Sequence, residues 1–251
     1  MLEKLDQKQV VKDYWGHRSS TFDDSPGHVL SSKREETAWK DLLKKKLGKA
    51  NRVLDVGAGT GFLSLMLAEM GYEVVGVDVS KNMIDRAKGK AEKKGLKIDF
   101  RVDDAENLSF EDNSFDAVVN RAVLWTLPDP EKAVREWKRV LKPDGKICFF
   151  VHEPHAGIVN NARKQLSKFL VLALERRNPW KSLKGSKGKL PFNGGFEPTK
   201  VVNLLEKVGF EHISAESTDE IRELKRENMS FPYRIAQNHS QYCYSALKPN
   251  R

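Results

Sequence analysis

Apolar and polar positions follow two alternating patterns through the middle of the chain. Short apolar runs, typical of buried strands, fall at residues 52–57, 73–78, 97–102, 115–120 and 146–151. Between them, residues 62–71, 80–95 and 129–142 carry apolar side chains at helical spacing. Strands that alternate with helices in this way predict an α/β fold with a doubly wound, parallel sheet.

Capping side chains mark the expected starts of the helices. Thr60, Ser80 and Asp129 are predicted to be N-caps. Ahead of the first strand, Ser32 and Glu35 match a capping box. The helix that follows presents one apolar face, which is expected to pack on the sheet and consists of Ala38, Trp39, Leu42, Leu43 and Leu47.

The pattern changes on both sides of this central part. Residues 14–28 are rich in aromatic and histidine side chains and show no helical periodicity. After residue 151, a helical run leads into a glycine-rich stretch, and a helix and two strands then resume the α/β pattern. The predicted organisation is an N-terminal helical segment (1–48), a core (49–153), an inserted basic lid (154–196) and a C-terminal part that completes the sheet (197–251).

Positive charge is concentrated in one part of the chain. The 251 residues carry a net charge of +9, and residues 151–190 contribute +7 of it through nine Lys or Arg and two acidic side chains. Such a block is typical of a solvated face, of a site for an acidic ligand or of a nucleic-acid contact. Few aromatic side chains apart from Trp180 are interleaved with it, which argues against RNA.

Other features exclude several classes of protein. Cys148 and Cys243 lie inside apolar runs and provide neither a disulfide framework nor a metal cluster. No apolar run approaches the roughly 18 residues that cross a membrane. The polar start of the chain lacks the apolar core of a signal peptide. A cytoplasmic protein that does not enter the membrane is therefore expected.

The loop after the first strand, Gly57-Ala58-Gly59-Thr60-Gly61, suits a bound ligand. Its glycines allow a ligand to approach the backbone and aim the N–H groups of the next helix at it. Asp78 ends the second strand 21 residues after Gly57, where a carboxylate accepts hydrogen bonds from ribose hydroxyls. Phe62 stands where a dinucleotide fingerprint has its third glycine, so the loop does not fit NAD.

Four successive stretches (53–61, 74–88, 101–119 and 139–149) resemble the ordered motifs of the class I S-adenosylmethionine-dependent methyltransferases. The resemblance covers roughly residues 50–151, then the terminal helix and two strands. It implies a Rossmann-like fold with a seven-stranded, mostly parallel sheet whose last strand is antiparallel. It also implies S-adenosyl-L-methionine as the cofactor and methyl transfer as the reaction.

The same resemblance implies roles for individual residues. Asp55 and the glycine loop would face the methionine part of the cofactor, and Asp78 would bind both ribose hydroxyls. Asp104 and Ala105 would contact the adenine ring, and Met83 would pack on it, although Met83 equally suits an ordinary core position. The full cofactor-binding set is Asp55, Gly57, Ala58, Gly59, Gly61, Asp78, Val79, Met83, Asp104, Ala105 and Asn120.

The methyl acceptor leaves a weaker trace, because a sulfonium is a good leaving group and the protein mainly aligns the acceptor. Three segments are expected to converge on the methyl group: 14–28, 120–125 and 152–155. Candidate catalytic side chains are Tyr14, His152 and His155; candidate substrate contacts are Trp15, His17, Arg18, Arg121 and Trp125, with His28 as a further candidate. A metal site at 152–155 is a weaker alternative, because too few ligands lie close together.

These patterns favour a methyltransferase that acts on a small, acidic metabolite held under the basic lid. Enzymes that methylate exocyclic amino groups of bases carry an Asn/Asp-Pro-Pro run that is absent after the fourth strand here. A second interpretation is an RNA or protein methyltransferase that docks through residues 151–190. A third is a sensor that binds S-adenosylmethionine without transferring its methyl group. The sequence leaves the oligomeric state open.

Overall fold

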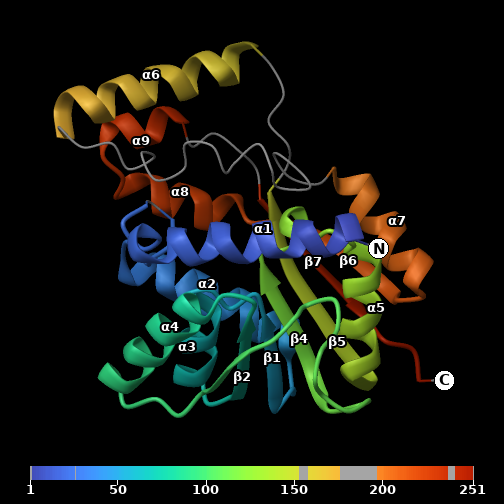
Figure 1. The fold of residues 1–251 in the computed structure, drawn as a ribbon. Helices are drawn as coiled ribbons and strands as arrows, with labels where there is room; N and C mark the ends of the chain where they lie inside the picture. Colours follow the sequence, from blue (N-terminus) through green and yellow to red (C-terminus); the bar gives the residue numbers. More distant parts are fainter. Residues whose placement is uncertain (1, 26, 153–157, 176–196, 237–240, 251) are drawn as a thin grey trace.

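The computed structural model describes residues 2–25, 27–152, 158–175, 197–236 and 241–250, and these hold one seven-stranded sheet (Figure 1). The strands are β1 (Arg52–Val56), β2 (Glu73–Asp78), β3 (Asp99–Val102), β4 (Phe115–Arg121), β5 (Leu141–His152), β6 (Glu211–Ser217) and β7 (Gln241–Leu247). Their order is β3-β2-β1-β4-β5-β7-β6. All neighbours are parallel except β7, which is antiparallel to β5 and β6. The predicted fold class is therefore confirmed.

Helices cover both faces of the sheet, because the central strands are apolar on both sides. They are α1 (Leu2–Arg18), α2 (Lys33–Leu47), α3 (Phe62–Glu69), α4 (Lys81–Lys93), α5 (Pro130–Val140), α6 (Ile158–Glu175), α7 (Pro198–Val208), α8 (Asp219–Glu227) and α9 (Phe231–Ala236), with short 3-10 turns η1 (Ser19–Thr21) and η2 (Leu124–Thr126). None of the helices in the described residues has the length and apolar character needed to cross a bilayer.

Each face has its own apolar core. On one face, Trp137 of α5 and Val201 of α7 pack with Leu54 and other side chains of the central strands. On the other face, α2, α3 and α8 contribute a second cluster that contains Trp39 and Ile221. The apolar face predicted for α2 packs on the sheet as expected. Both cysteines are buried.

The N-terminal helix occupies a different place from the covering helices. Figure 1 shows α1 crossing the sheet at one end of the strands rather than lying on a face. Lys8, Val11 and Trp15 of α1 share a pocket with Asp78 and Arg121, the last residues of β2 and β4. The helix therefore covers the carboxyl ends of the parallel strands, which is where ligands bind in open α/β sheets.

Most of the predicted helix starts are confirmed, and one is wrong. The side chains of Ser32, Ser80 and Asp129 accept hydrogen bonds from the first turns of α2, α4 and α5. Thr60 was expected to cap α3, but the cap is Gly61, whose φ is +88°. A left-handed glycine starts this helix without a side-chain cap, and the Thr60 hydroxyl instead donates to Asp23, 2.7 Å away.

The prediction that residues 14–28 lack helical structure is wrong for their first five residues. Helix α1 continues to Arg18. Val11 and Tyr14, three positions apart on one helix face, are buried together against Val79 and Trp125. The apolar face begins upstream of residue 14, so a window that starts there misses its period. Helices α8 and α9, between β6 and β7, were also not predicted.

Trp137 joins α5 to the segment after β3. Its side chain is fully buried, and its Nε1–H donates to the carbonyl oxygen of Ala105 at 3.0 Å. Trp137→Phe is expected to lower the free energy of unfolding by about 1–3 kcal/mol more than a loss of packing alone, because the carbonyl loses its donor.

Urea denaturation measures this difference, and Trp39→Phe is a matched control. Trp39 is also buried, but its indole nitrogen has no hydrogen-bond partner within the described residues. Equal losses of unfolding free energy in the two variants would contradict a stabilising role for the Trp137 hydrogen bond.

Candidate functional site

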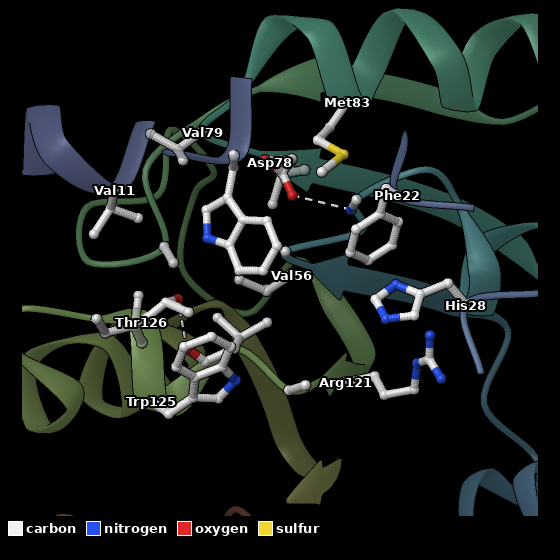
Figure 2. Close-up of a pocket in the computed structure, with 18 of the residues that line it drawn as sticks. Val11, Phe22, His28, Val56, Asp78, Val79, Met83, Arg121, Trp125 and Thr126 are labelled. Carbon is white, nitrogen blue, oxygen red and sulfur yellow. Dashed lines mark hydrogen bonds between the residues drawn. The ribbon is translucent and has the colours of Figure 1, made fainter. Parts of the chain in front are cut away.

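A pocket of about 670 Å³ lies between the carboxyl ends of the central strands and the N-terminal segment. Its wall includes side chains from α1, from the loops after β1, β2, β3 and β4, and from α8. The volume lies within the range of about 300–1,000 Å³ that is usual for small-molecule sites. Figure 2 shows part of the wall, with Asp78 and Met83 at one edge and Arg121 and Trp125 at the other.

Asp78 connects the end of β2 to the glycine loop. Its carboxylate oxygens accept hydrogen bonds from the backbone N–H of Gly59 at 3.0 Å and of Ser80 at 2.9 Å. Burial raises the pKa of Asp78 to about 6, and these two N–H donors act in the opposite sense. The carboxylate is thus held at the pocket wall with its acceptor lone pairs only partly used.

Two glycines of the loop line the pocket, and each is required for a different reason. Gly57 has φ of +68°, and a Cβ added there would lie 2.3 Å from Cγ2 of Val123, so packing alone requires a glycine. Gly59 has φ of +56°, and its nearest neighbour would be Cε1 of Phe22 at 3.9 Å. The backbone at Gly59 therefore borders open space, so a ligand can approach it closely. Ala58 and Gly61 do not line the pocket.

Asp55 lies behind the glycine loop rather than in the pocket wall. It is fully buried, and its carboxylate accepts from the backbone N–H of Ser64 at 3.0 Å and from the Ser64 hydroxyl. Burial raises the pKa of Asp55 to about 6. Since Ser64 lies in the first turn of α3, Asp55 satisfies an N-terminal donor of that helix and thereby fixes the loop before it.

The segment after β3 forms the second half of the expected cofactor site. Asp104 and Ala105 line the pocket there together with Val79 and Met83. The Oδ2 atom of Asp104 accepts from Nζ of Lys8 at 2.6 Å, and its Oδ1 accepts from the backbone of Glu106. Helix α1 is thus fastened over this part of the pocket by an ion pair.

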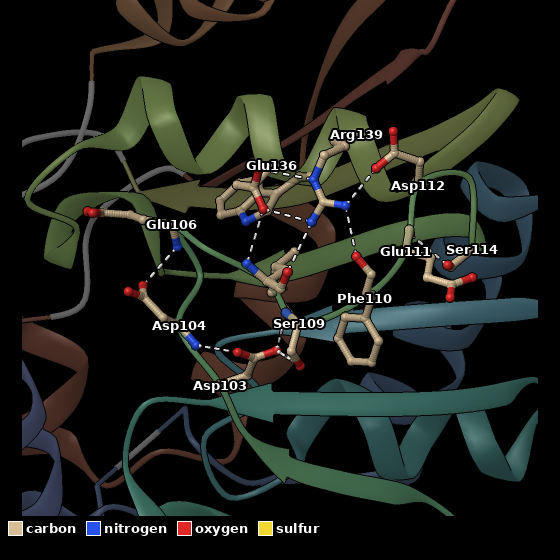
Figure 3. A network of polar contacts seen from close by, with 12 residues as sticks. Asp103, Asp104, Glu106, Ser109, Phe110, Glu111, Asp112, Ser114, Glu136 and Arg139 are labelled. Carbon is tan, nitrogen blue, oxygen red and sulfur yellow. Dashed lines mark hydrogen bonds and ion pairs between the residues drawn. The ribbon is translucent and has the colours of Figure 1, made fainter.

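A polar network holds the same segment against α5 (Figure 3). Arg139 donates to the carbonyl oxygens of Leu108 and Phe110 and forms ion pairs with Glu136 and Asp112, each at 2.8 Å. The pKa of Arg139 is raised by hydrogen bonds to these two carboxylates. The loop that carries Asp104 and Ala105 is therefore fixed from outside the pocket, before any ligand binds.

Aromatic side chains form the wall opposite the glycine loop. The Trp15 ring meets Phe22 and Trp125 edge to face, with ring centres 5.9 and 6.0 Å apart. His28 packs edge to face on Phe22 at 3.8 Å. Burial, and then the nearby charge of Arg121, lower the pKa of His28 to about 2, so its imidazole is neutral. Its Nδ1 has no hydrogen-bond partner among the described residues.

The structure brings together twelve of the twenty residues predicted from sequence. Those that line the pocket are Gly57, Gly59, Asp78, Val79, Met83, Asp104, Ala105, Trp15, Arg121, Trp125, His152 and the further candidate His28. Those that lie outside its wall are Asp55, Ala58, Gly61, Asn120, Tyr14, His17 and Arg18. His155 lies outside the described residues, as does most of the basic lid.

The residues outside the wall have other contacts or are buried. Tyr14 packs beside Val11, and burial raises the pKa of its hydroxyl. His17 is exposed and bonds through Nδ1 to the Asp13 backbone. Arg18 donates to the hydroxyls of Thr21 and Ser25. Asn120 is buried in β4, and neither atom of its amide has a partner within the described residues.

Some pocket residues were missed by reasoning from sequence. Lys8, Glu35, Arg222, Lys225 and Gln241 all line the pocket, yet they lie outside every motif. The sequence pattern indicates only a capping role for Glu35, and it does not predict α8, which carries Arg222 and Lys225. No cluster of three or more metal-ligating side chains occurs in the described part of the chain.

Comparisons with known proteins agree on the class. Residues 54–149 match the family model described as a methyltransferase domain. A ubiquinone biosynthesis O-methyltransferase from Coxiella burnetii is 40% identical over 153 residues, which are 59% of this chain and 62% of that protein. A demethylmenaquinone methyltransferase from Staphylococcus saprophyticus is 29% identical over 86% of this chain and 94% of that protein.

Solved structures share the fold. Phosphoethanolamine N-methyltransferase 2 from Haemonchus contortus, in complex with phosphomonomethylethanolamine and S-adenosylhomocysteine, aligns with a TM-score of 0.64 at 21% identity. The alignment covers 92% of this chain and 57% of that one. Residues 54–149 thus match a methyltransferase domain, as the motifs predict, and the chain shares the fold of this solved methyltransferase.

The pocket fits S-adenosylmethionine, the cofactor of this class. Asp78 presents a fixed carboxylate where ribose hydroxyls would donate, and Gly59 leaves the loop open beside it. The fixed backbone of Ala105 would face the adenine. Trp15 and Trp125 would place aromatic faces near a sulfonium, which cation–π attraction favours.

Asp78→Ala is expected to weaken binding of S-adenosylhomocysteine by about 1.5–3 kcal/mol, or roughly 10- to 150-fold, because ribose hydroxyls lose a charged acceptor. Calorimetry on the purified protein measures this affinity. Asp41→Ala, on the exposed side of α2, is the control and is expected to bind like the native chain. Native affinity in Asp78→Ala would contradict the role of Asp78.

Affinity for S-adenosylhomocysteine is also expected to fall as the pH drops through about 6, the raised pKa of Asp78. Only the ionised carboxylate accepts from both hydroxyls, so binding is strong above this pH and weak below it. A calorimetric series from about pH 5 to about pH 8 tests this. In Asp78→Asn the step should vanish. A step that persists would assign the titration to another group, such as Asp55, whose pKa is also about 6.

Proposed function

We propose that this chain transfers a methyl group from S-adenosylmethionine to a small molecule by in-line displacement. The observation that carries the proposal is that the two ends of one pocket are lined by side chains of different chemistry. One end, around Asp78 and Ala105, suits the nucleoside of the cofactor. The other end, around His28, Arg121 and Lys225, is left for an acceptor.

Alignment and exclusion of water are the main tasks of the protein in such a reaction. S-adenosylmethionine supplies the methyl group and leaves as a neutral thioether. Helix α1 covers the pocket, and its Lys8 is fastened to Asp104 and Glu106 at 2.6 and 2.8 Å. Because this ion pair joins α1 to the loop after β3, it holds the helix over the nucleoside end.

Proton transfer depends on the acceptor. An acceptor that must lose a proton needs a base within hydrogen-bond reach. His28 is neutral, but its pKa of about 2 makes it a poor base. His152, at the end of β5 and 3.5 Å from Gln241, is the better candidate within the described pocket. An acceptor that is already deprotonated would need neither.

The helices that surround the pocket favour a small acceptor over a macromolecule. Side chains of α1, α2 and α8 all border the pocket, so an acceptor must enter between elements rather than dock on an open face. The relatives are named for ubiquinone biosynthesis and for demethylmenaquinone, which are small molecules. Docking of RNA or protein through residues 151–190 remains the second candidate, because that segment is strongly basic.

Methyl-labelled S-adenosylmethionine, incubated with the protein and a cell extract, tests the proposal. Separation into small-molecule, protein and nucleic-acid fractions should place the label in the small-molecule fraction, both with and without nuclease treatment. Asp78→Asn serves as the control for cofactor-dependent labelling. Label in RNA or protein would contradict the small-molecule acceptor, and absence of label with cofactor binding intact would favour a sensor.

A further inference from the structure

The acceptor end of the pocket contains two cations that lack a carboxylate partner. Arg121 ends β4 and Lys225 lies on α8, and both line the pocket. Neither forms an ion pair with any carboxylate of the described residues, and Lys225 donates no hydrogen bond there. The neighbouring Arg222 differs, because it pairs with Asp219 at 2.7 Å and with Glu223 at 3.0 Å.

Arg121 is held in a fixed position with most of its donors free. Its guanidinium carbon lies 3.9 Å from the centre of the Phe62 ring, and one of its nitrogens donates to the Gly27 carbonyl at 2.9 Å. A guanidinium has five N–H donors in one plane, so this single bond leaves donors for a bidentate contact. Figure 2 shows the Arg121 side chain beside His28, on the opposite side of the pocket from Met83.

One carboxylate, Glu35, shares this end of the pocket, but it is already engaged. Its Oε2 accepts from the backbone N–H of Ser31 at 2.8 Å and from the Ser31 hydroxyl at 2.6 Å. Asp55 and Glu35 moderate the charge of Arg121, and Glu35 that of Lys225, from a distance and without a direct contact.

Keeping both side chains charged in this pocket is unfavourable, because they are buried close to each other. Burial lowers the pKa of Arg121 to about 10, and burial together with the charge of Arg121 lowers the pKa of Lys225 to about 8. His28 cannot share the charge as a cation, because the same environment keeps it neutral. An anion bound between the two side chains would remove this cost, whereas a neutral or cationic ligand would not.

The strand order separates these cations from the nucleoside end. Asp78 ends β2 and Arg121 ends β4, and β1 with its glycine loop lies between them in the sheet. We propose that Arg121 and Lys225 bind an oxyanion on the methyl acceptor, a carboxylate or a phosphate. This inference rests on the proposed function, and it names the substrate class: small molecules with an anionic group.

The test uses inorganic phosphate as the probe and protein saturated with S-adenosylhomocysteine, so that the carboxylate of the cofactor is already bound. Trp15, Trp39 and Trp125 line the pocket, so tryptophan fluorescence or calorimetry can follow the titration. Saturable binding of phosphate is expected. Lys225→Met should weaken it by about 10- to 100-fold, while Lys225→Arg keeps the charge and should largely preserve it.

Two further variants complete the design. Arg121→Met should weaken phosphate binding to a similar extent. Lys93→Met, on the exposed side of α4, is the charge-matched control and should bind phosphate like the native chain. Since Lys225 is half-buried on a helix, its variants keep the test decisive even where Arg121→Met fails to fold.

Three results would overturn the inference. The first is the absence of saturable phosphate binding to the complex, and the second is equal binding of phosphate to Lys225→Met and to the native chain. The third is that the Arg121 and Lys225 variants bind S-adenosylhomocysteine more weakly but bind 5′-methylthioadenosine like the native chain, which would assign both cations to the cofactor's own carboxylate. Failure of the native chain to bind S-adenosylhomocysteine would instead contradict the proposed function.

Discussion

The hydrogen bond between the Asp78 carboxylate and the backbone N–H of Gly59 is the constraint on which the site depends. It joins the ends of two adjacent parallel strands across the loop that carries the glycines. Parallel strands are connected through crossover helices, so each strand leads at its carboxyl end into a loop that runs to the next helix. The loop after β1 must leave the sheet, turn through left-handed backbone at Gly57 and Gly59, and enter α3. The bond to Asp78 fixes that turn.

Further polar contacts, outside the pocket, fix the start of α3 and the loop after β3. Asp55 holds the start of α3 through Ser64, and Arg139 holds the loop after β3 against α5. Neither the Asp55 carboxylate nor the Arg139 guanidinium lines the pocket, so their hydrogen bonds are made before any ligand arrives. The nucleoside end is thus preorganised, which lowers the entropy that binding must overcome. Within the described part of the chain, no comparable network surrounds Lys225 at the other end of the pocket.

Much of the fold and of the nucleoside end could be predicted from the sequence, because their signals are local. The strands show as apolar runs, Ser80 and Asp129 sit just before their helices, and Asp78 stands at a fixed distance from the glycine loop. Thr60 was misjudged because a glycine in left-handed conformation can begin a helix without a side-chain cap. The helical end of α1 was missed because its apolar period begins upstream of the segment considered.

The acceptor end could not be predicted in the same way, because its residues share no local pattern. His28, Glu35, Arg121, Lys225 and Gln241 meet only after the sheet has formed and α8 has packed beside α2. Arg121 alone among these five lies within residues 54–149, the stretch that matches the methyltransferase family. The matched stretch holds most of the residues at the end of the pocket that we assign to the cofactor. The segments around it supply most of the side chains at the end that we propose for the acceptor, so a family match points to the cofactor, whereas the acceptor has to be inferred from the folded pocket.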